Sequence, residues 1–338
     1  MRWKYLVGKN YLLKNKILIV GNAVTDSDTI KTISKQLDVV TIQPHELKKA
    51  LNEQKNTIAL WIHLDTFLDE SYLDEVIKIP FLISTTTGLT HIASAIQDFY
   101  GPNLISLRNR SVFLSKISAT AEHAWILILL WNNHICKAFT SVLNGVWSRN
   151  DFFREKQLAG QTLGIIGYGR LGKMVANYGL AFKMQVIIFE IEANAISEAK
   201  DKNFEVVESL EDLFNKSNII SIHANYNSGT LPIITADILC KINKPLLLVN
   251  TARAGLVDEE AVIKEISERP YLYYFTDVLK CEEDGQEIQF SHLWKHSIAE
   301  DRVKISPHIG GANLEAAQLC EKELLNDFLQ KLHLFLIK

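Results

Sequence analysis

Residues Leu163 to Glu190 read LGIIGYGRLGKMVANYGLAFKMQVIIFE, and the architecture of the chain follows from this stretch. An apolar strand leads into Gly167, Gly169 and Gly172, then into a helix and a second strand that ends in an acid. The first glycine permits a tight turn, the second lets backbone approach a pyrophosphate, and the third allows close packing of helix against strand. A glycine triplet alone also occurs in ordinary turns, but here strand, helix and acid together predict a dinucleotide-binding unit.

Glu190 lies 18 residues after Gly172. A carboxylate at this position accepts hydrogen bonds from the ribose hydroxyls of the adenosine half of the cofactor. Ile191 and Glu192 follow, so an apolar group and a second negative charge stand where a 2′-phosphate would need arginine. NAD is therefore favoured over NADP as the cofactor.

Length and composition describe an ordinary globular chain with a small-molecule partner. At 338 residues the chain is long enough for two domains. Hydrophobic residues make up 47% and the formal charge is −3, which gives no electrostatic reason to expect nucleic acid. Four widely spaced cysteines predict neither a zinc cluster nor a disulfide framework, and no metal is expected.

Targeting signals are also not evident in the sequence. The opening MRWKYLVGKNYLLKNK has no continuous apolar core for secretion. The longest apolar run, Ala124 to Trp131, covers eight residues, whereas a membrane span needs about 20. We expect a soluble cytoplasmic protein that does not enter a membrane.

Short strands and helices alternate along the whole chain. Apolar strands are expected over 16–20, 38–42, 58–64, 81–86 and 103–108, with helices between them, as in a parallel sheet. A single long apolar helix is expected over 118–139, and an aromatic stretch with Trp147, Phe152 and Phe153 follows it. Further strand and helix units extend the nucleotide-binding sheet, and a last helix over 313–335 is expected to return to the first domain.

Three later segments bring chemically useful side chains to the ends of strands. They are VNTARAGLVDEEAV with Arg253, FTDVLKCEE with Asp277 and Glu282, and ISPHIGGA with His308. The carboxyl ends of strands form the edge at which open α/β sheets bind ligands. The alternative is a set of surface ion pairs worth less than about 1 kcal/mol each.

Together with TAEHA at 120–124 and the glycine loop, these segments resemble the D-isomer-specific 2-hydroxyacid dehydrogenases, in particular their phosphoglycerate dehydrogenase-like members. The resemblance implies an α/β fold of two Rossmann-like parallel-sheet domains with a cleft between them. Residues 1–115 with 310–338 would form a flavodoxin-like substrate-binding domain, and 116–309 the NAD-binding domain. The implied activity is NAD(H)-dependent interconversion of a 2-keto acid and a D-2-hydroxy acid.

By this resemblance Arg253 binds the substrate, Glu282 is the catalytic carboxylate and His308 is the general acid and base. The chemistry agrees with each role. A guanidinium offers a rigid fork of donors to a carboxylate and its neighbouring carbonyl. Histidine can donate and accept a proton near neutral pH, and a carboxylate on its other ring nitrogen fixes the tautomer and stabilises the imidazolium.

The resemblance implies further contacts for both ligands. The cofactor contacts would be Thr87, Gly167, Gly169, Arg170, Leu171, Gly172, Glu190, Thr251, Asp277 and Gly310. The substrate contacts would be Thr86, Thr87 and Gly88, with Arg253. His123 and His223 are expected to be structural, and Cys281, which adjoins Glu282, is expected to have no catalytic role.

The chain departs from the family pattern at a few positions. Thr90 and His91 stand where aspartate and asparagine are usual, and Ala254 replaces a glycine. Glu283 stands where proline usually follows the glutamate, which predicts a less rigid loop at Glu282.

Relatives dimerise through the long helix and the extension after it, so a homodimer is expected. Two rival functions remain open on the sequence alone. One is an NAD-responsive corepressor-like binding protein, and the other is a family member that acts on a different acid, such as phosphite.

Overall fold

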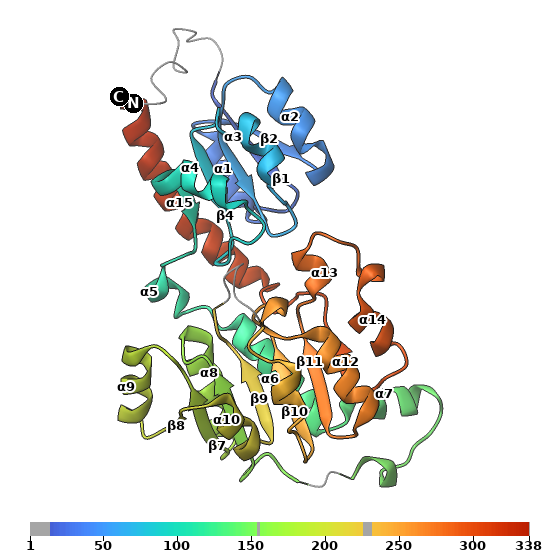
Figure 1. Cartoon of the computed structure of the whole chain (residues 1–338). Coiled ribbons are helices and arrows are strands. Elements are labelled where there is room, and N and C mark those ends of the chain that lie inside the picture. Colours follow the sequence, from blue (N-terminus) through green and yellow to red (C-terminus); the bar gives the residue numbers. More distant parts are fainter. Residues whose placement is uncertain (1–13, 154–155, 226–231, 338) are drawn as a thin grey trace. The chain divides into compact units, whose positions relative to one another are not determined.

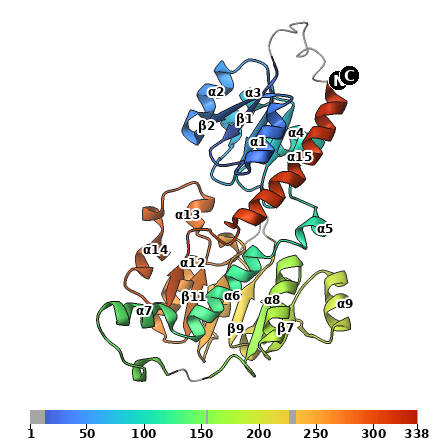
Figure 2. The same ribbon diagram turned by 180° about the vertical axis from the view of Figure 1, so that it is seen from behind.

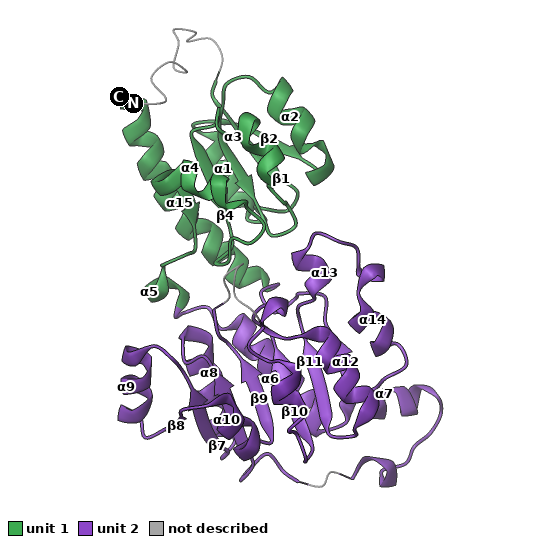
Figure 3. Ribbon diagram, in the orientation of Figure 1, with its two compact units in different colours: residues 1–114, 313–338 green, residues 115–312 purple. Residues whose placement is uncertain are grey.

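The computed structural model describes residues 14–153, 156–225 and 232–337, and the chain separates into two compact units (Figure 3). Unit 1 comprises residues 1–114 and 313–338, and unit 2 comprises residues 115–312. The opening segment, expected to carry no secretion signal, lies up to residue 13 outside the described residues.

Unit 1 is built on a parallel sheet of five strands. The strands are β1 (Lys16–Val20), β2 (Asp38–Ile42), β3 (Thr57–Ile62), β4 (Phe81–Ser84) and β5 (Leu104–Ser106). Their order is β2-β1-β3-β4-β5, and all four neighbouring pairs are parallel. This is the flavodoxin-like order, in which each strand is buried by helices packed on the two faces of the sheet.

The helices of unit 1 come from both ends of the chain. They are α1 (Ser27–Ser34), α2 (Leu47–Glu53), α3 (Leu73–Val76), α4 (Ser94–Tyr100), α5 (Ser111–Leu114) and α15 (Leu314–Ile337). The last helix lies along unit 1 beside α1 and α4 (Figures 1 and 2). Its Glu321, which is 2% exposed, accepts hydrogen bonds from the backbone of Thr25 at 2.9 Å and of Asp26 at 2.8 Å. The ring of Phe328 packs edge-on against Phe81 of β4.

Unit 2 contains a parallel sheet of seven strands. They are β6 (Thr162–Ile166), β7 (Gln185–Phe189), β8 (Glu205–Val207), β9 (Ile219–Ile222), β10 (Leu246–Asn250), β11 (Leu272–Thr276) and β12 (Val303–Ile305). Their order is β12-β11-β10-β9-β6-β7-β8. The order reverses between β6 and β9, which is the switch point where a doubly wound sheet binds its ligand. The predicted class of two parallel-sheet α/β domains is confirmed.

Helices cover both faces of this sheet because its strands are apolar on both sides. The helices are α6 (Ala119–Asn132), α7 (Ile135–Leu143), α8 (Arg170–Ala181), α9 (Ala193–Asp201), α10 (Leu210–Lys216), α11 (Ala236–Leu239), α12 (Glu259–Glu268), α13 (Lys280–Glu283) and α14 (His292–Ser297). One core packs α6 and α8 against alternate strand residues such as Leu163 and Val249 (Figure 2). The other packs α10 and α12 against Ile166 and Leu248 (Figure 1).

The single helix expected over 118–139 is two helices, so this prediction is wrong. The chain breaks between α6 and α7, where His134, the N-cap of the second helix, has a φ of 51°. The two axes are bent by 63°. Among the described residues no single helix is long and apolar enough to cross a membrane, and this bent pair meets the length and composition for a span only when taken together.

Candidate active site

The glycine loop runs from the end of β6 into α8. Gly167 has a φ of +90°, and a Cβ there would lie 2.7 Å from the backbone nitrogen of Ala224. A Cβ on Gly172 would lie 2.0 Å from the carbonyl oxygen of Gly167, so helix and strand approach too closely for any side chain. Both positions therefore require glycine for packing, and Gly167 requires it for its backbone conformation as well.

Gly169 differs from its two neighbours because a Cβ built there meets nothing within 4 Å. It is the N-cap of α8, and no side chain of the described residues caps this helix. The first-turn amides are consequently left for an anionic group, and the helix dipole favours negative charge at this end. The loop fits a pyrophosphate. Arg170 and Leu171 open the helix; the guanidinium of Arg170 donates to the carbonyl of Ile117 at 2.7 Å.

Glu190 lies at the end of β7 beside this loop. Its Oε2 accepts from the Tyr168 amide at 2.7 Å, and its Oε1 accepts from the amides of Ile191 at 2.7 Å and Glu192 at 3.0 Å. Three backbone donors thus fix one carboxylate at the edge of the glycine turn. The side chain of Ile191 is 79% exposed, and Glu192 is exposed beside it. This arrangement suits two ribose hydroxyls and repels a 2′-phosphate.

Two buried polar atoms at the ends of the central strands lack partners among the described residues. They are Oγ1 of Thr251, just after β10, and Nδ1 of His223, just after β9. Buried polar groups are nearly always hydrogen-bonded, so two such atoms without partners at the carboxyl ends of the neighbouring strands β9 and β10 fit a ligand that supplies the missing partners. Burial lowers the pKa of His223 to about 3, and its Nε2 lies 2.9 Å from Ser221 Oγ. The ring is therefore neutral.

Arg253 follows β10 and begins the turn η5 (Ala254–Leu256). Asn250, fully buried at the end of the strand, accepts from the amide of Ala252 and donates to the carbonyl of Arg253 at 2.9 Å. The half-buried guanidinium donates to the carbonyl of Ala252 at 2.7 Å. Sequence reasoning did not single out Asn250, although its place at the end of a predicted strand was a usable signal.

His308 and Glu282 meet across two segments 26 residues apart. Nδ1 of His308 lies 2.6 Å from Oε1 of Glu282, which belongs to the short helix α13. Both side chains are partly exposed. His308 has a φ of 52°, a left-handed conformation that is uncommon for a residue with a Cβ and that persists only where neighbouring structure enforces it.

Asp277, which directly follows β11, holds the loop of His308 in this conformation. Its Oδ1 accepts from the amide of Ile309 at 3.0 Å and its Oδ2 from the amide of Gly310 at 2.7 Å. Ser306 donates to Oδ1 at 2.5 Å, and Nε2 of His123 lies 3.2 Å from the same oxygen. The carboxylate is 2% exposed and clamps the loop on both sides of His308.

The charge of Asp277 is maintained by these donors. Burial alone would raise the pKa of Asp277, but hydrogen bonds from His123, Ser306, Gly310 and Ile309 outweigh it and hold the pKa below its usual value. Asp277 and Gly310, which are both predicted to contact the cofactor, therefore also contact each other. Ser306 was not foreseen as part of the clamp.

The predicted substrate residues Thr86, Thr87 and Gly88 lie in unit 1, after the carboxyl end of β4. Thr86 Oγ1 donates to the carbonyl of Gly88 at 2.7 Å and lies 2.9 Å from Ser84 Oγ. The buried His91, unusual at its position in the family pattern, places Nε2 3.1 Å from the same serine oxygen. Thr87 is part of the same loop. All other predicted site residues lie in unit 2.

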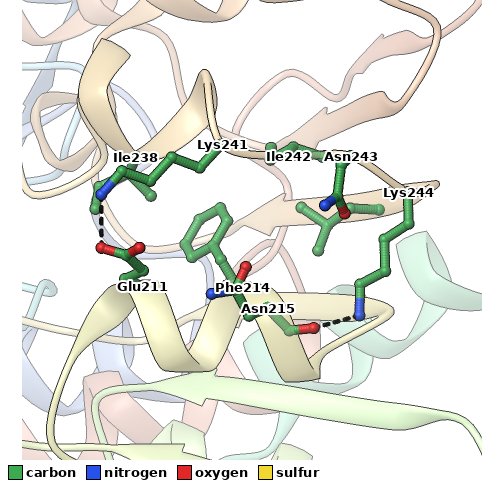
Figure 4. A pocket seen from close by; sticks show the side chains of 9 residues that line it. Glu211, Phe214, Asn215, Ile238, Lys241, Ile242, Asn243 and Lys244 are labelled. Atoms are coloured by element: carbon green, nitrogen blue, oxygen red, sulfur yellow. Dashed lines mark hydrogen bonds and ion pairs between the residues drawn. The ribbon is translucent and has the colours of Figure 1, made fainter.

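A small hollow in unit 2 lies next to Leu246, the first residue of β10 (Figure 4). It is therefore at the amino end of this strand, whereas Arg253 follows the carboxyl end. The ammonium group of Lys241 lies 2.5 Å from Glu211, and that of Lys244 donates to the carbonyl of Asn215 at 2.6 Å. Its lining contains none of the predicted site residues. The hollow is therefore separate from the glycine loop and from the strand ends that carry Arg253 and Asp277.

The chain is similar in sequence to known proteins. Residues 125–310 match the family described as D-isomer specific 2-hydroxyacid dehydrogenase, NAD binding domain. A hydroxypyruvate reductase of Thermotoga maritima is 32% identical over 214 residues, which are 63% of this chain and 66% of that protein. A D-3-phosphoglycerate dehydrogenase of Mycobacterium leprae is 26% identical over 300 residues, or 89% of this chain and 54% of that protein.

A solved structure shares the fold over nearly the whole chain. The phosphoglycerate oxidoreductase from Vibrio cholerae superposes with a TM-score of 0.77 at 22% identity, covering 94% of this chain and 99% of that one. This likeness concerns the fold alone. The matched part of this chain spans only about half to two thirds of the length of the two curated relatives above.

Proposed function

This chain belongs to the D-isomer specific 2-hydroxyacid dehydrogenases, with unit 2 as its NAD-binding domain, and we propose that it interconverts a 2-keto acid and a D-2-hydroxy acid. The observation that carries the proposal is the His308–Glu282 pair, which stands with Arg253 after the carboxyl ends of neighbouring strands. An acid–base histidine near a carboxylate-binding arginine is what reduction of a keto acid requires.

NAD would be held by the glycine loop at its pyrophosphate and by Glu190 at its ribose. When bound, the reduced cofactor supplies the hydride that the carbonyl carbon accepts. Thr251 and His223 offer their buried, unpartnered atoms near the switch point. Asp277 and Gly310 would line the same part of the site while fixing the His308 loop.

Proton transfer falls to His308. As the keto group is reduced, its oxygen must gain a proton, which Nε2 of an imidazolium can donate while Nδ1 stays hydrogen-bonded to Glu282. The carboxylate stabilises the charged ring before transfer and fixes its tautomer afterwards. In the oxidative direction the neutral ring takes the proton back.

Substrate binding falls to Arg253 and, in unit 1, to the loop at Thr86, Thr87 and Gly88. The guanidinium fork pairs with the substrate carboxylate and polarises the adjacent carbonyl. The unit 1 loop offers threonine side chains and backbone close to a glycine. We accordingly propose that unit 1 contributes to substrate binding through this loop.

We also propose a homodimer that forms through α7 and the segment after it. No residue of α7 is buried among the described residues, and Phe139, Val142 and Leu143 share one face of the helix. Trp147 is 90% exposed and Phe153 66%. An apolar surface of this kind is characteristic of protein interfaces. None of the four cysteines, all of which lie among the described residues, forms a disulfide, which agrees with the cytoplasmic location that we propose.

Light scattering tests the dimer directly. The wild type is expected at twice the chain mass and a Phe139→Ser, Leu143→Ser variant at the monomer mass. Leu180→Ser, an exposed apolar residue of α8, is the control and is expected to leave the dimer intact. A monomeric wild type would rule the interface out.

The function is tested by NADH oxidation against glyoxylate, pyruvate, hydroxypyruvate, bulkier 2-keto acids and, in reverse with NAD, phosphite. Turnover of one or more keto acids supports the proposal. Turnover of phosphite alone would assign a different acid. Tight NADH binding without any turnover would favour the corepressor-like alternative.

A further inference from the structure

We propose that Glu283 is a positioning residue: its carboxylate holds the turn that presents Arg253, a role that rests on the dehydrogenase function proposed above. Glu283 follows the catalytic carboxylate directly in sequence, where the family usually has proline. The absence of that proline predicts a less rigid loop. The contacts of Glu283 instead tie this loop to the arginine turn.

Glu283 binds the turn through both of its oxygens. Oε1 accepts from the amide of Ala254 at 2.8 Å, and Oε2 accepts from the amide of Gly255 at 3.0 Å. These are the first two residues after Arg253 and the first two of η5, whose amides have no partner within such a short helix. A bidentate carboxylate that accepts from two consecutive amides fixes both the position and the direction of the turn.

Asn250 holds the other half of the same turn. Its side chain accepts from the amide of Ala252 at 3.0 Å and donates to the carbonyl of Arg253 at 2.9 Å. The backbone on one side of the arginine is therefore restrained by its own strand. On the other side the restraint comes from Glu283, 28 to 29 residues away in sequence.

The short helix α13 joins the two functional groups. Successive residues of a helix point about 100° apart, so adjacent carboxylates reach different partners. Glu282 reaches His308 Nδ1, and Glu283 reaches the arginine turn. A shift of α13 would therefore disturb the acid–base pair and the substrate-binding turn together.

A second carboxylate, that of Glu259, also connects the arginine turn and its following helix to α13. In this contact α13 provides the amide donor instead of the carboxylate acceptor. Oε1 of Glu259, the first residue of α12, accepts from the amide of Lys280, the first residue of α13, at 2.9 Å. The segments 254–259 and 280–283 thus exchange carboxylate–amide bonds. Because Glu283 is largely desolvated, its pKa is raised, while the two amides and the Arg253 guanidinium act in the opposite direction. Hydrogen bonds to a carboxylate count for more in such surroundings.

A role confined to stability makes different predictions from a positioning role. Loss of a purely structural bond lowers the melting temperature and leaves kcat and KM of the folded enzyme unchanged. Loss of positioning raises KM for the keto acid and lowers kcat, while NADH affinity stays the same because the glycine loop and Glu190 are untouched. A displacement of about 1 Å at a substrate-binding group lowers rates by up to roughly a hundredfold.

The test compares Glu283→Ala and Glu283→Gln with Asp284→Asn in the full chain. Asp284 is the next residue and is exposed, and its replacement removes one charge in the same place, so it is a matched control. Glutamine keeps one acceptor oxygen but turns its NH₂ group toward the second amide donor, so it is expected to lie between alanine and wild type. Melting temperature and NADH affinity are measured for every variant.

Two readouts separate the parts of the proposal. Hydrogen exchange of peptides covering residues 252–258 reports the turn without any need for substrate, and exchange is expected to be about tenfold faster or more in Glu283→Ala, because two amides lose their acceptor. Keto-acid kinetics report the consequence, and kcat/KM is expected to fall roughly ten- to hundredfold. Asp284→Asn should match wild type in both measurements.

Each result has a definite meaning. If the wild type turns over no keto acid, the proposed function is refuted. The hydrogen-exchange data then still test whether Glu283 holds the turn after Arg253. An active wild type whose Glu283→Ala variant stays within about twofold in kcat/KM overturns the positioning role. If the Glu283→Ala variant does not fold, Glu283→Gln provides the test. Unchanged kinetics in a folded Glu283→Gln variant would also overturn the positioning role.

Discussion

Nδ1 of His308 lies 2.6 Å from Oε1 of Glu282, although the two residues come from separate segments of unit 2, the loop after β12 and the short helix α13. The contact occupies one ring nitrogen and leaves the other for the proton transfer that we propose. Because His308 also has a left-handed backbone, its ring direction depends on both the carboxylate and the clamp at Asp277. His308, the proposed acid–base group, is thus fixed through its side chain and its backbone at once.

Replacing His308 by glutamine should lower kcat for keto-acid reduction by about 10² to 10⁴, the usual contribution of a general acid. NADH binding should be retained, because the glycine loop lies on other strands. Stopped-flow single turnovers and NADH fluorescence titration measure the two quantities. Equal loss of both would indicate that the loop has collapsed rather than that a proton donor is missing.

Replacing Arg253 by lysine should lower kcat/KM for the keto acid roughly a hundredfold, because a single ammonium cannot present the planar fork. The loss should appear chiefly in the KM of the keto acid. Steady-state kinetics with both substrates varied provide the measurement. Lys280→Arg, at an exposed position of α13, is a control for altered cation chemistry and should leave kinetics unchanged.

Replacing Glu190 by alanine should weaken NADH binding about tenfold or more, since hydrogen bonds to a charged group contribute roughly 1.5 to 3 kcal/mol. Adding Ile191→Arg should improve NADPH binding, because Ile191 is exposed and adjoins the carboxylate. Isothermal titration with both cofactors tests this. Unchanged preference in the double variant would contradict the assignment of Glu190 to the ribose.

Asp277→Asn should destabilise the protein by roughly 1 to 3 kcal/mol at pH 7, because a buried and fully bonded acceptor loses its charge and part of its capacity. The pKa of Asp277 is lowered in the folded state, so its charged form adds stability above the unfolded value of about 3.9. That stability is lost as pH falls through the folded pKa. Urea unfolding should therefore show the variant approaching wild type below about pH 4.

Glu259 should give the opposite pH dependence. Burial raises the pKa of Glu259 to about 7, with Glu283 and Glu260 adding to the rise and Lys280 opposing it. Between its ordinary value of 4.5 and about 7 the native state binds more protons than the unfolded state, so stability falls as pH rises through this window. Glu259→Gln should be more stable relative to wild type at about pH 8 than at about pH 5. Equal differences at both pH values in urea unfolding would exclude the effect.

Several parts of the molecule could be predicted because the information is local. Strands β1 and β2 begin and end at the predicted residues, since each is a short segment rich in β-branched and other apolar residues. The requirement for glycine at 167 and 172 follows from the strand-to-helix turn itself. Residues at strand ends, such as Arg253, follow from the same pattern.

Other parts depend on partners distant in sequence. The break at His134 carries no glycine or proline signal, and the predicted helix runs through it. The contact of Glu283 with two amides could not be predicted, because no pattern of residue types in the sequence marks which backbone amides a side chain will bind. The clamp at Asp277 likewise combines residues from α6, β11 and the segment after β12.

The return of α15 to unit 1 has a consequence for biosynthesis. Phe328 and Glu321 are buried in unit 1, yet residues 115–312 are translated between them and the rest of that unit. At about 5 to 20 residues per second, the ribosome needs roughly 10 to 40 seconds to make this insertion. During that interval the apolar side chain of Phe81 lacks its cover, while unit 2 is already emerging complete. Unit 1 therefore cannot complete its packing until α15 has been made, and a nascent chain stalled before α15 leaves the ring of Phe81 without this contact.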